Sequence, residues 1–371
     1  MNTRIVPEPI ARQPWVVILP LTALVCFGAA VLYSAAGGHL QPWALKHLMR
    51  FAAFLGMALL IARLRRELFQ FAAFPIYAAL VILLVLVEII GGISGGSQRW
   101  INLGFMTLQP SELMKPAIVL VLARFYDALP PAMTASWRAL APALGILGVP
   151  AALVMLQPDL GTALAITFGA LVVIFLAGTP LKWFVGGGIA AAIAGPVAFF
   201  TLLHDYQRKR VFVFLDPQSD PLGSGYHIAQ SEIAIGSGGF FGKGFLNGSQ
   251  SHLDYLPESH TDFVFATMAE EWGMLGGLFV LLVFGIILRW ALQVARAAPD
   301  RFSQLLATGM AFTIFFYAAI NLSMVMGLAP VVGIPLPFMS HGGSSMMTNM
   351  ICIGTIMAID RWNKSGPRAL S

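Results

Sequence analysis

Long apolar stretches separated by short polar segments dominate this chain. The stretches are about 20 residues long, which suits a helix that crosses a bilayer. They are continuously apolar and do not alternate, so they favour helices over a membrane β-barrel. We therefore expect an all-α polytopic membrane protein with about ten transmembrane helices, in which residues 1–371 form a single transmembrane domain. The predicted spans lie near 15–35, 43–62, 69–90, 112–129, 137–156, 159–178, 182–203, 262–288, 304–325 and 344–360.

The composition agrees with this pattern. Hydrophobic residues make up 58% of the chain and charged residues 11%, whereas soluble domains contain about 25% charged residues. The net charge of +5 comes from basic residues placed between the apolar stretches, which indicates membrane topology and not nucleic-acid binding. The first stretch lacks a small-residue cleavage site, so we expect it to be retained as the first helix.

Lysine and arginine are distributed unequally between the two sets of short loops. If the N-terminus is inside, the outer short loops contain only Lys46, Arg50 and Arg99. The positive-inside rule then places both termini in the cytoplasm and the long loop of about residues 204–261, between helices 7 and 8, outside. The predicted cytoplasmic residues are Arg4, Arg12, Arg63, Arg65, Arg66, Arg124, Arg138, Lys182, Arg289, Arg296, Arg301, Arg361, Lys364 and Arg368.

The long loop contains two recognisable segments. Residues 226–235 carry apolar side chains at helical spacing, which predicts a helix along the membrane surface. Residues 236–248 are rich in glycine, but Ser237 and Gly244 break the phosphate-binding loop pattern. Two interpretations of this run stay open: a structural loop with tight turns, and a backbone nest for a diphosphate.

Asp262 lies where the long polar loop enters an apolar helix, beside Glu258, His260 and Thr261. A carboxylate at a hydrocarbon boundary is costly, so its position calls for a reason. One interpretation is a helix N-cap. The alternative is a general base whose pKa is raised by partial desolvation, although a protonated His260 would lower that pKa.

Three further polar groups lie at or within the first turns of predicted spans. Glu112 and Lys115 are spaced for a salt bridge on one helix face, either as a structural pair or as part of a polar cavity. Asp159 is placed to cap the sixth span. Glu270 and Glu271 lie about two turns into the eighth span, where we expect hydrogen bonds between helices or exposure to a cavity.

Basic and irregular segments complete the outer side. The scattered basic residues of the outer side, among them Arg50, Arg99, Arg210 and Lys243, suggest a lipid-linked phosphate as substrate, with attraction to anionic headgroups as the alternative. The histidines match no zinc motif. Residues 330–345 contain three prolines and three glycines, which exclude an ordinary helix and predict a re-entrant or cavity-lining loop.

Several motifs, in order along the chain, resemble those of the SEDS family (shape, elongation, division and sporulation). The compact termini and residues 252–257 resemble its rod-shape branch more than its division branch. The motifs are Ser97–Trp100, Gln109–Glu112, Gln157–Thr162, Asp205–Arg210, Leu215–Gly223, Gly242–Gly244, Asn247–Ser251, Pro257–Phe263 and Pro335–Ser344.

The resemblance implies ten transmembrane helices and peptidoglycan glycosyltransferase activity on the outer face of the cytoplasmic membrane. The implied substrates are lipid II and the growing lipid-linked glycan, and the implied partner is a class B penicillin-binding protein (transpeptidase) of the elongation complex. The sequence departs from the family pattern at Phe245, Ser259 and His341. At matching positions Asp262 is the implied catalytic base, and the implied cavity or substrate-binding residues are Arg99, Glu112, Lys115, Asp159, Arg210, Lys243, His260 and Ser340.

A sugar on a lipid diphosphate is already activated, so this chemistry requires no nucleotide or redox cofactor. A divalent cation (Mg²⁺ or Mn²⁺) is compatible with it, but no ligand set is visible in the sequence. Two other functions stay in competition. A lipid-linked precursor flippase would concentrate its charges near the bilayer midplane, and a non-catalytic scaffold of the elongation complex would tolerate loss of the outer acids.

Overall fold

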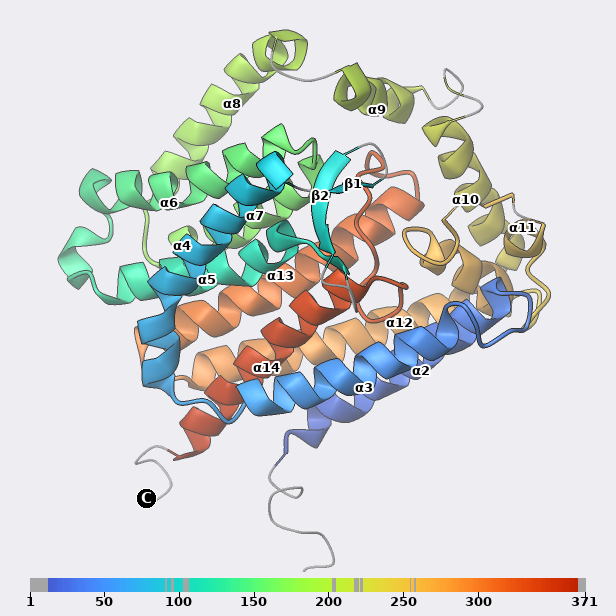
Figure 1. The fold of residues 1–371 in the computed structure, drawn as a ribbon, viewed down its shortest axis with the longest axis horizontal. Coiled ribbons are helices and arrows are strands. Elements are labelled where there is room, and N and C mark those ends of the chain that lie inside the picture. Colours follow the sequence, from blue (N-terminus) through green and yellow to red (C-terminus); the bar gives the residue numbers. More distant parts are fainter. Residues whose placement is uncertain are drawn as a thin grey trace, which may run out of the picture.

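The computed structural model describes residues 13–365 except 91, 95–96, 103–106, 202–204, 217–219, 221–222, 254 and 257. The fold is a bundle of long helices (Figure 1). A helix lies at each predicted span: α2 (Trp15–Ala35), α3 (Ala44–Ile61), α4 (Arg66–Ile90), α5 (Pro110–Asp127), α6 (Trp137–Leu156), α7 (Leu160–Leu176), α8 (Leu181–Thr201), α12 (Val264–Ala297), α13 (Arg301–Val325) and α14 (Gly343–Ser365). A 3₁₀ turn, η1 (Pro131–Met133), precedes α6.

Within the described residues, seven helices are long and apolar enough to cross a membrane. They are α2, α3, α4, α6, α8, α12 and α13, and α7 is a shorter apolar helix. The nearly all-helical, multi-pass architecture is therefore confirmed. Helices α5 and α14 carry many polar residues, such as the buried Glu112, Lys115 and Asn349. Because these side chains face the protein interior and not lipid, a central helix tolerates them.

A short antiparallel sheet lies between α4 and α5 and was not predicted. Its strands are β1 (Gly92–Ser94), β2 (Ser97–Asn102) and β3 (Thr107–Leu108), in the order β1-β2-β3. Ile93 pairs with Gln98, and Ile101 pairs with Leu108. Strands of two to six residues are too short for an alternating pattern to reveal them.

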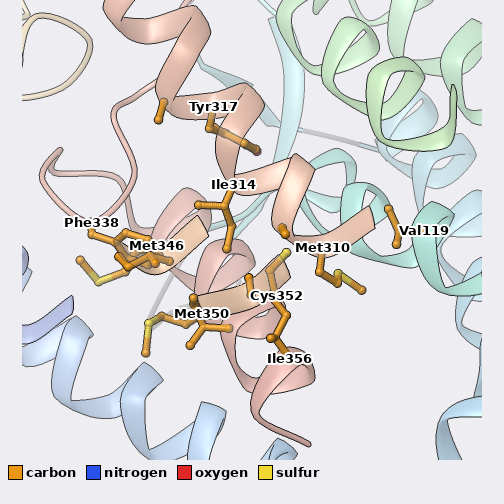
Figure 2. Packing of buried hydrophobic residues seen from close by; sticks show 14 of the residues in the cluster. Val119, Met310, Ile314, Tyr317, Phe338, Met346, Met350, Cys352 and Ile356 are labelled. Carbon is orange, nitrogen blue, oxygen red and sulfur yellow. The ribbon is translucent and has the colours of Figure 1, made fainter. Parts of the chain in front are cut away.

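The core is formed where α5, α13 and α14 pack together. Met310 and Ile314 from α13 meet Met350, Cys352 and Ile356 from α14 in this region (Figure 2). Small residues allow the backbones to approach closely. A side chain at Gly309 of α13 would come within 2.5 Å of Val119 on α5, so glycine is required for this helix contact.

The long loop contains α9 (Asp205–Leu215), α10 (Ser224–Gly238) and α11 (Ser249–His252). Helix α10 includes the predicted surface helix and packs on α12. Its buried Ser231 donates a hydrogen bond to the carbonyl oxygen of Val325, at 2.7 Å. This part of the loop is thus attached to the bundle.

The glycine-rich run after α10 docks into a break in α12. Gly273 interrupts that helix with φ 62° and ψ −155°, and Gly242 lies so close that a Cβ would meet the carbonyl oxygen of Glu271 at 2.1 Å. The N–H groups of Lys243 and Gly244 donate to the carbonyl oxygens of Glu270 and Glu271, at 2.9 and 3.0 Å. These N–H groups are already used, so the structural-loop interpretation is correct and the diphosphate-nest interpretation is wrong for them.

Candidate active site

A cavity of about 710 Å³ opens between α3, α5, α7, the turn before α12 and the loop of residues 328–342. Its volume is in the range of small-molecule sites, roughly 300–1,000 Å³. Four acids and two arginines are among the described residues that line it. The predicted cavity-lining role of residues 330–345 is confirmed by Val332, Gly333, Pro335, His341 and Gly342, which form part of its wall. The lining acids and arginines are Glu112, Asp159, Glu258, Asp262, Arg50 and Arg210.

Asp262 presents its carboxylate to this cavity. The N-cap of α12 is Phe263, and no side chain caps the helix, so the helix-cap interpretation of Asp262 is wrong. Within the described residues the carboxylate makes no hydrogen bond or ion pair. A Cβ on Gly333 would lie 3.6 Å from its Oδ2 atom, which shows that the loop approaches Asp262 closely. The carboxylate is thereby available to a ligand.

Burial raises the pKa of Asp262 to about 6; the charge of Glu258 acts in the same direction and that of Arg210 opposes it. The side chain is partly exposed, because it opens into the cavity. Burial also lowers the pKa of His260, so this imidazole is neutral at neutral pH. The direction of the Asp262 pKa shift, which the sequence left open, is therefore upward, since His260 carries no charge that would stabilise the carboxylate.

The backbone at Asp262 is fixed by a buried amide on α13. Asn321 Nδ2 donates to the carbonyl oxygens of Asp262 and Ile334, at 2.8 and 2.7 Å. One side chain thus connects the turn before α12 to the cavity-lining loop. Because both acceptors are main-chain atoms, the bridge sets where the Asp262 side chain begins without contacting its carboxylate.

Ser340 makes a second connection between the same two segments. Its hydroxyl donates to the carbonyl oxygen of Thr261 at 2.6 Å and accepts from the N–H of Leu336 at 2.8 Å. The N–H of His341 donates to the carbonyl oxygen of His260 at 2.9 Å. Ser340 is buried and is not among the cavity-lining residues, so the structure gives it a positioning role.

Glu112 and Lys115 form the expected ion pair, at 2.6 Å, with a third partner. Tyr317 from α13 donates its hydroxyl to Glu112 Oε2 at 2.6 Å, and Lys115 Nζ contacts the same hydroxyl. All three side chains are buried. Glu112 lines the cavity and Lys115 lies behind it, so this pair is both a structural link and part of the cavity wall.

Asp159 is the N-cap of α7, as its position predicted. Its Oδ1 atom accepts from the N–H of Thr162 at 3.0 Å, and Oδ2 accepts from Gln109 Nε2 at 3.0 Å. Asp159 also lines the cavity. Capping and cavity exposure are therefore compatible for this residue.

The predicted basic residues do not all reach the cavity. Arg210 lines it from α9. Lys243 instead pairs with the buried Glu270 at 2.6 Å and is not among the described lining residues. His260 stacks on Trp43 with ring centroids 4.2 Å apart. Arg99 belongs to β2, but its side chain lies outside the described part of the structure.

Sequence reasoning did not select Arg50, Tyr317 or Asn321 as site residues. Tyr317 and Asn321 are spaced four residues apart in a largely apolar span, which places both on one helix face. That spacing was a usable signal of a polar interior contact. Arg50 was grouped with the outer basic residues, and nothing in the sequence indicates that it faces the cavity.

The described residues contain no group of three or more His, Cys, Asp or Glu side chains arranged to hold a metal ion. A Mg²⁺ or Mn²⁺ ion in this cavity would therefore be held by one or two of these side chains together with ligand oxygens and water, which is the common arrangement for Mg²⁺.

Comparison with known proteins gives concordant matches along almost the whole chain. Residues 13–365 match the model of the "Cell cycle protein" family, which covers FtsW, RodA and SpoVE. "Peptidoglycan glycosyltransferase MrdB" of Escherichia coli (strain K12) is 41% identical over 351 residues, covering 94% of this chain and 93% of MrdB.

Two solved structures are similar along nearly their full lengths. One is described as "Structural coordination of polymerization and crosslinking by a peptidoglycan synthase complex"; it aligns with a TM-score of 0.81 and 32% identity, covering 96% of this chain and 99% of the other. The rod shape determining protein RodA of Thermus thermophilus aligns with a TM-score of 0.67 and 29% identity, covering 94% and 97%.

Proposed function

The chain belongs to the family of FtsW, RodA and SpoVE, and on that premise we propose that it is a peptidoglycan glycosyltransferase that polymerises lipid II during cell elongation. Its relatives are named peptidoglycan glycosyltransferases. The observation that carries the proposal is the carboxylate of Asp262, which faces a polar cavity without a partner among the described residues and has its pKa raised to about 6. A base with that pKa is ionised at neutral pH and still accepts a proton readily.

In the proposed reaction, Asp262 takes the proton from the acceptor sugar hydroxyl. The oxygen then forms a bond to the anomeric carbon of the donor while the bond from that carbon to the diphosphate oxygen breaks. The electron pair leaves with the lipid diphosphate, and the proton remains on Asp262 until it is released to water. A single displacement inverts the anomeric configuration and needs one carboxylate as base.

Arginine in the cavity supports the departure of the diphosphate. Arg210 lines the cavity near Asp262, and a guanidinium matches the geometry of phosphate oxygens. Its charge also limits how far the pKa of Asp262 rises. A Mg²⁺ or Mn²⁺ ion in this reaction would be held chiefly by substrate oxygens, because the described residues offer no three-ligand group.

The proposal includes the membrane arrangement and a partner. The distribution of Lys and Arg supports cytoplasmic termini and a cavity on the extracytoplasmic face of the cytoplasmic membrane. The similar structure of a peptidoglycan synthase complex that coordinates polymerisation and crosslinking supports a crosslinking partner, for which a class B penicillin-binding protein has the appropriate transpeptidase chemistry.

The test uses purified protein, its partner synthase and labelled lipid II. We expect polymer from the native chain and none from Asp262→Ala. Asp360→Asn is the matched control, because Asp360 forms a partly exposed pair with Lys364, and such pairs contribute about 0–1 kcal/mol. Folding of each variant is checked by thermal unfolding in detergent.

Three outcomes would contradict the proposal. Full activity in folded Asp262→Ala would exclude this residue as the base. Lipid translocation in liposomes by a native protein that makes no polymer would favour the flippase, and the absence of both activities would favour the scaffold.

A further inference from the structure

Arg50 lies in the wall of the same cavity as Asp262. It belongs to α3 and is partly buried. Its Nη1 atom lies 3.2 Å from His341 Nε2, and no carboxylate in the described residues lies within ion-pair distance of it. A partly buried cation at a membrane boundary is costly without a counter-charge. The guanidinium of Arg50 is therefore placed to form an ion pair with an anionic ligand in the cavity.

His341 orients this guanidinium as a hydrogen-bond acceptor. A guanidinium only donates, so Nε2 of His341 is unprotonated and the ring proton resides on Nδ1. Burial, followed by the charge of Arg50, lowers the pKa of His341 to about 4, so the imidazole stays neutral at neutral pH. The contact occupies one N–H of a group that has five, which leaves donors for a ligand.

Both residues are held by neighbouring elements. The N–H of His341 donates to the carbonyl oxygen of His260 at 2.9 Å, two residues from Asp262. A Cβ on Gly343 would lie 3.5 Å from Arg50 Cζ, so the guanidinium rests against the start of α14. The position of Arg50 is thus connected to the turn that carries Asp262.

The surroundings of Arg50 indicate the class of ligand. Ala53 and Phe54, three and four residues further along α3, line the same cavity and give an apolar wall beside the charge. The planar fork of arginine suits paired phosphate oxygens. We propose that Arg50, oriented by His341, is a binding residue for the diphosphate of the lipid-linked substrate; this inference rests on the proposed function.

A phospholipid headgroup carries the same phosphate chemistry, so the test separates the two sources. Native protein, Arg50→Gln and Arg50→Lys are reconstituted in nanodiscs of phosphatidylcholine alone and with phosphatidylglycerol. Lipid II polymerisation then gives KM and kcat. Lys46→Gln is the matched control, because it removes one positive charge one turn earlier on α3 from an exposed residue that is not among the described cavity-lining residues.

We expect Arg50→Gln to raise the KM for lipid II by about ten- to a hundredfold in both nanodiscs, which is the range for losing hydrogen bonds to a charged group. The kcat should change much less, because the lost contact exists before the reaction. Arg50→Lys retains the charge without the fork, so its KM should be intermediate, and Lys46→Gln should have the native KM.

His341 is tested as a positioning residue. His341→Phe keeps a ring and removes the acceptor, so it should raise KM. His341→Gln keeps an acceptor oxygen and should restore the native KM. The double variant Arg50→Gln, His341→Phe should be no worse than Arg50→Gln, because His341 acts through Arg50. Additive effects in the double variant would overturn this role.

Binding of labelled lipid II to Asp262→Asn protein, with and without Arg50→Gln, separates this inference from the proposed function. A native chain that makes no polymer refutes the proposed function. The binding measurement still tests the role of Arg50: weaker binding of lipid II to the protein with Arg50→Gln supports the inference, and unchanged binding overturns it. With an active native chain, a folded Arg50→Gln variant whose KM stays within about twofold of native overturns the inference alone. A defect confined to nanodiscs with phosphatidylglycerol also overturns it, in favour of a headgroup site.

Discussion

Asp262 and Glu270 are two carboxylates near the start of α12, and they differ in their hydrogen-bond partners. Glu270 is fully buried and accepts from Lys243 Nζ at 2.6 Å, Ser249 Oγ at 3.0 Å and the N–H of Gln250 at 3.1 Å. The Asp262 carboxylate has no such partner among the described residues and faces the cavity. A satisfied buried carboxylate stabilises a fold, whereas an unsatisfied one at a cavity is available for chemistry.

The largest expected effect comes from Asp262→Asn, which should lower the polymerisation rate by about 10²–10⁴-fold, the usual contribution of a general base. Its thermal stability above pH 6 should match or exceed that of the native chain. The reason is that a raised pKa means that folding disfavours the ionised carboxylate, a cost present above the folded pKa of about 6 and lost below the unfolded value of about 4. Rate and Tm are measured on the same preparation. A large fall in Tm would show that Asp262 is structural.

Asn321→Leu should have the next largest effect. It should lower kcat, while Asp262 remains the base. Loss of the bridge between Asp262 and Ile334 leaves two carbonyl oxygens without this donor and lets the turn shift. A displacement of about 1 Å costs on the order of 10²-fold in rate. Asn321→Asp, which keeps the shape but replaces the donor amide, is the matched variant. Native kcat in both would contradict the positioning role.

Glu270→Ala should act mainly on stability. The change leaves Lys243 and the N–H of Gln250 without their acceptor, at a cost of about 1–3 kcal/mol. Because Lys243 is partly exposed, water compensates some of this loss. Thermal unfolding should show a lower Tm, while kcat per folded molecule stays near native. A fall in kcat comparable to that of Asp262→Asn would remove the contrast between the two acids.

The smallest expected effect is a shift of the pH–rate profile. Native kcat/KM should rise with pH through about 6, as Asp262 becomes ionised. Glu258→Gln removes a charge that raises this pKa, so the rising limb should move to lower pH. Arg210→Gln removes a charge that lowers it, so the limb should move to higher pH. Each shift is expected to be up to about one unit. Shifts in the same direction would contradict this assignment.

The order of elements and part of the site were predictable because they depend on local patterns. Apolar runs gave the positions of the long helices, and the spacing of Glu112 and Lys115 gave their ion pair. The sheet at residues 92–108 was missed because its strands are short. The helix-cap alternative for Asp262 stayed open because sequence does not show which residue begins a helix to within one position.

The sequence by itself determined a multi-pass helical protein, a carboxylate at the entrance to α12 and a proline- and glycine-rich segment that no helix can accommodate. These follow from hydropathy and backbone chemistry, which act over a few residues. Only the tertiary structure decided which charges have partners. It pairs Lys243 with Glu270, Tyr317 with Glu112 and His341 with Arg50. The Asp262 carboxylate instead faces the cavity. Such pairings join residues up to 291 positions apart, so they are set by how the helices pack and not by any local pattern.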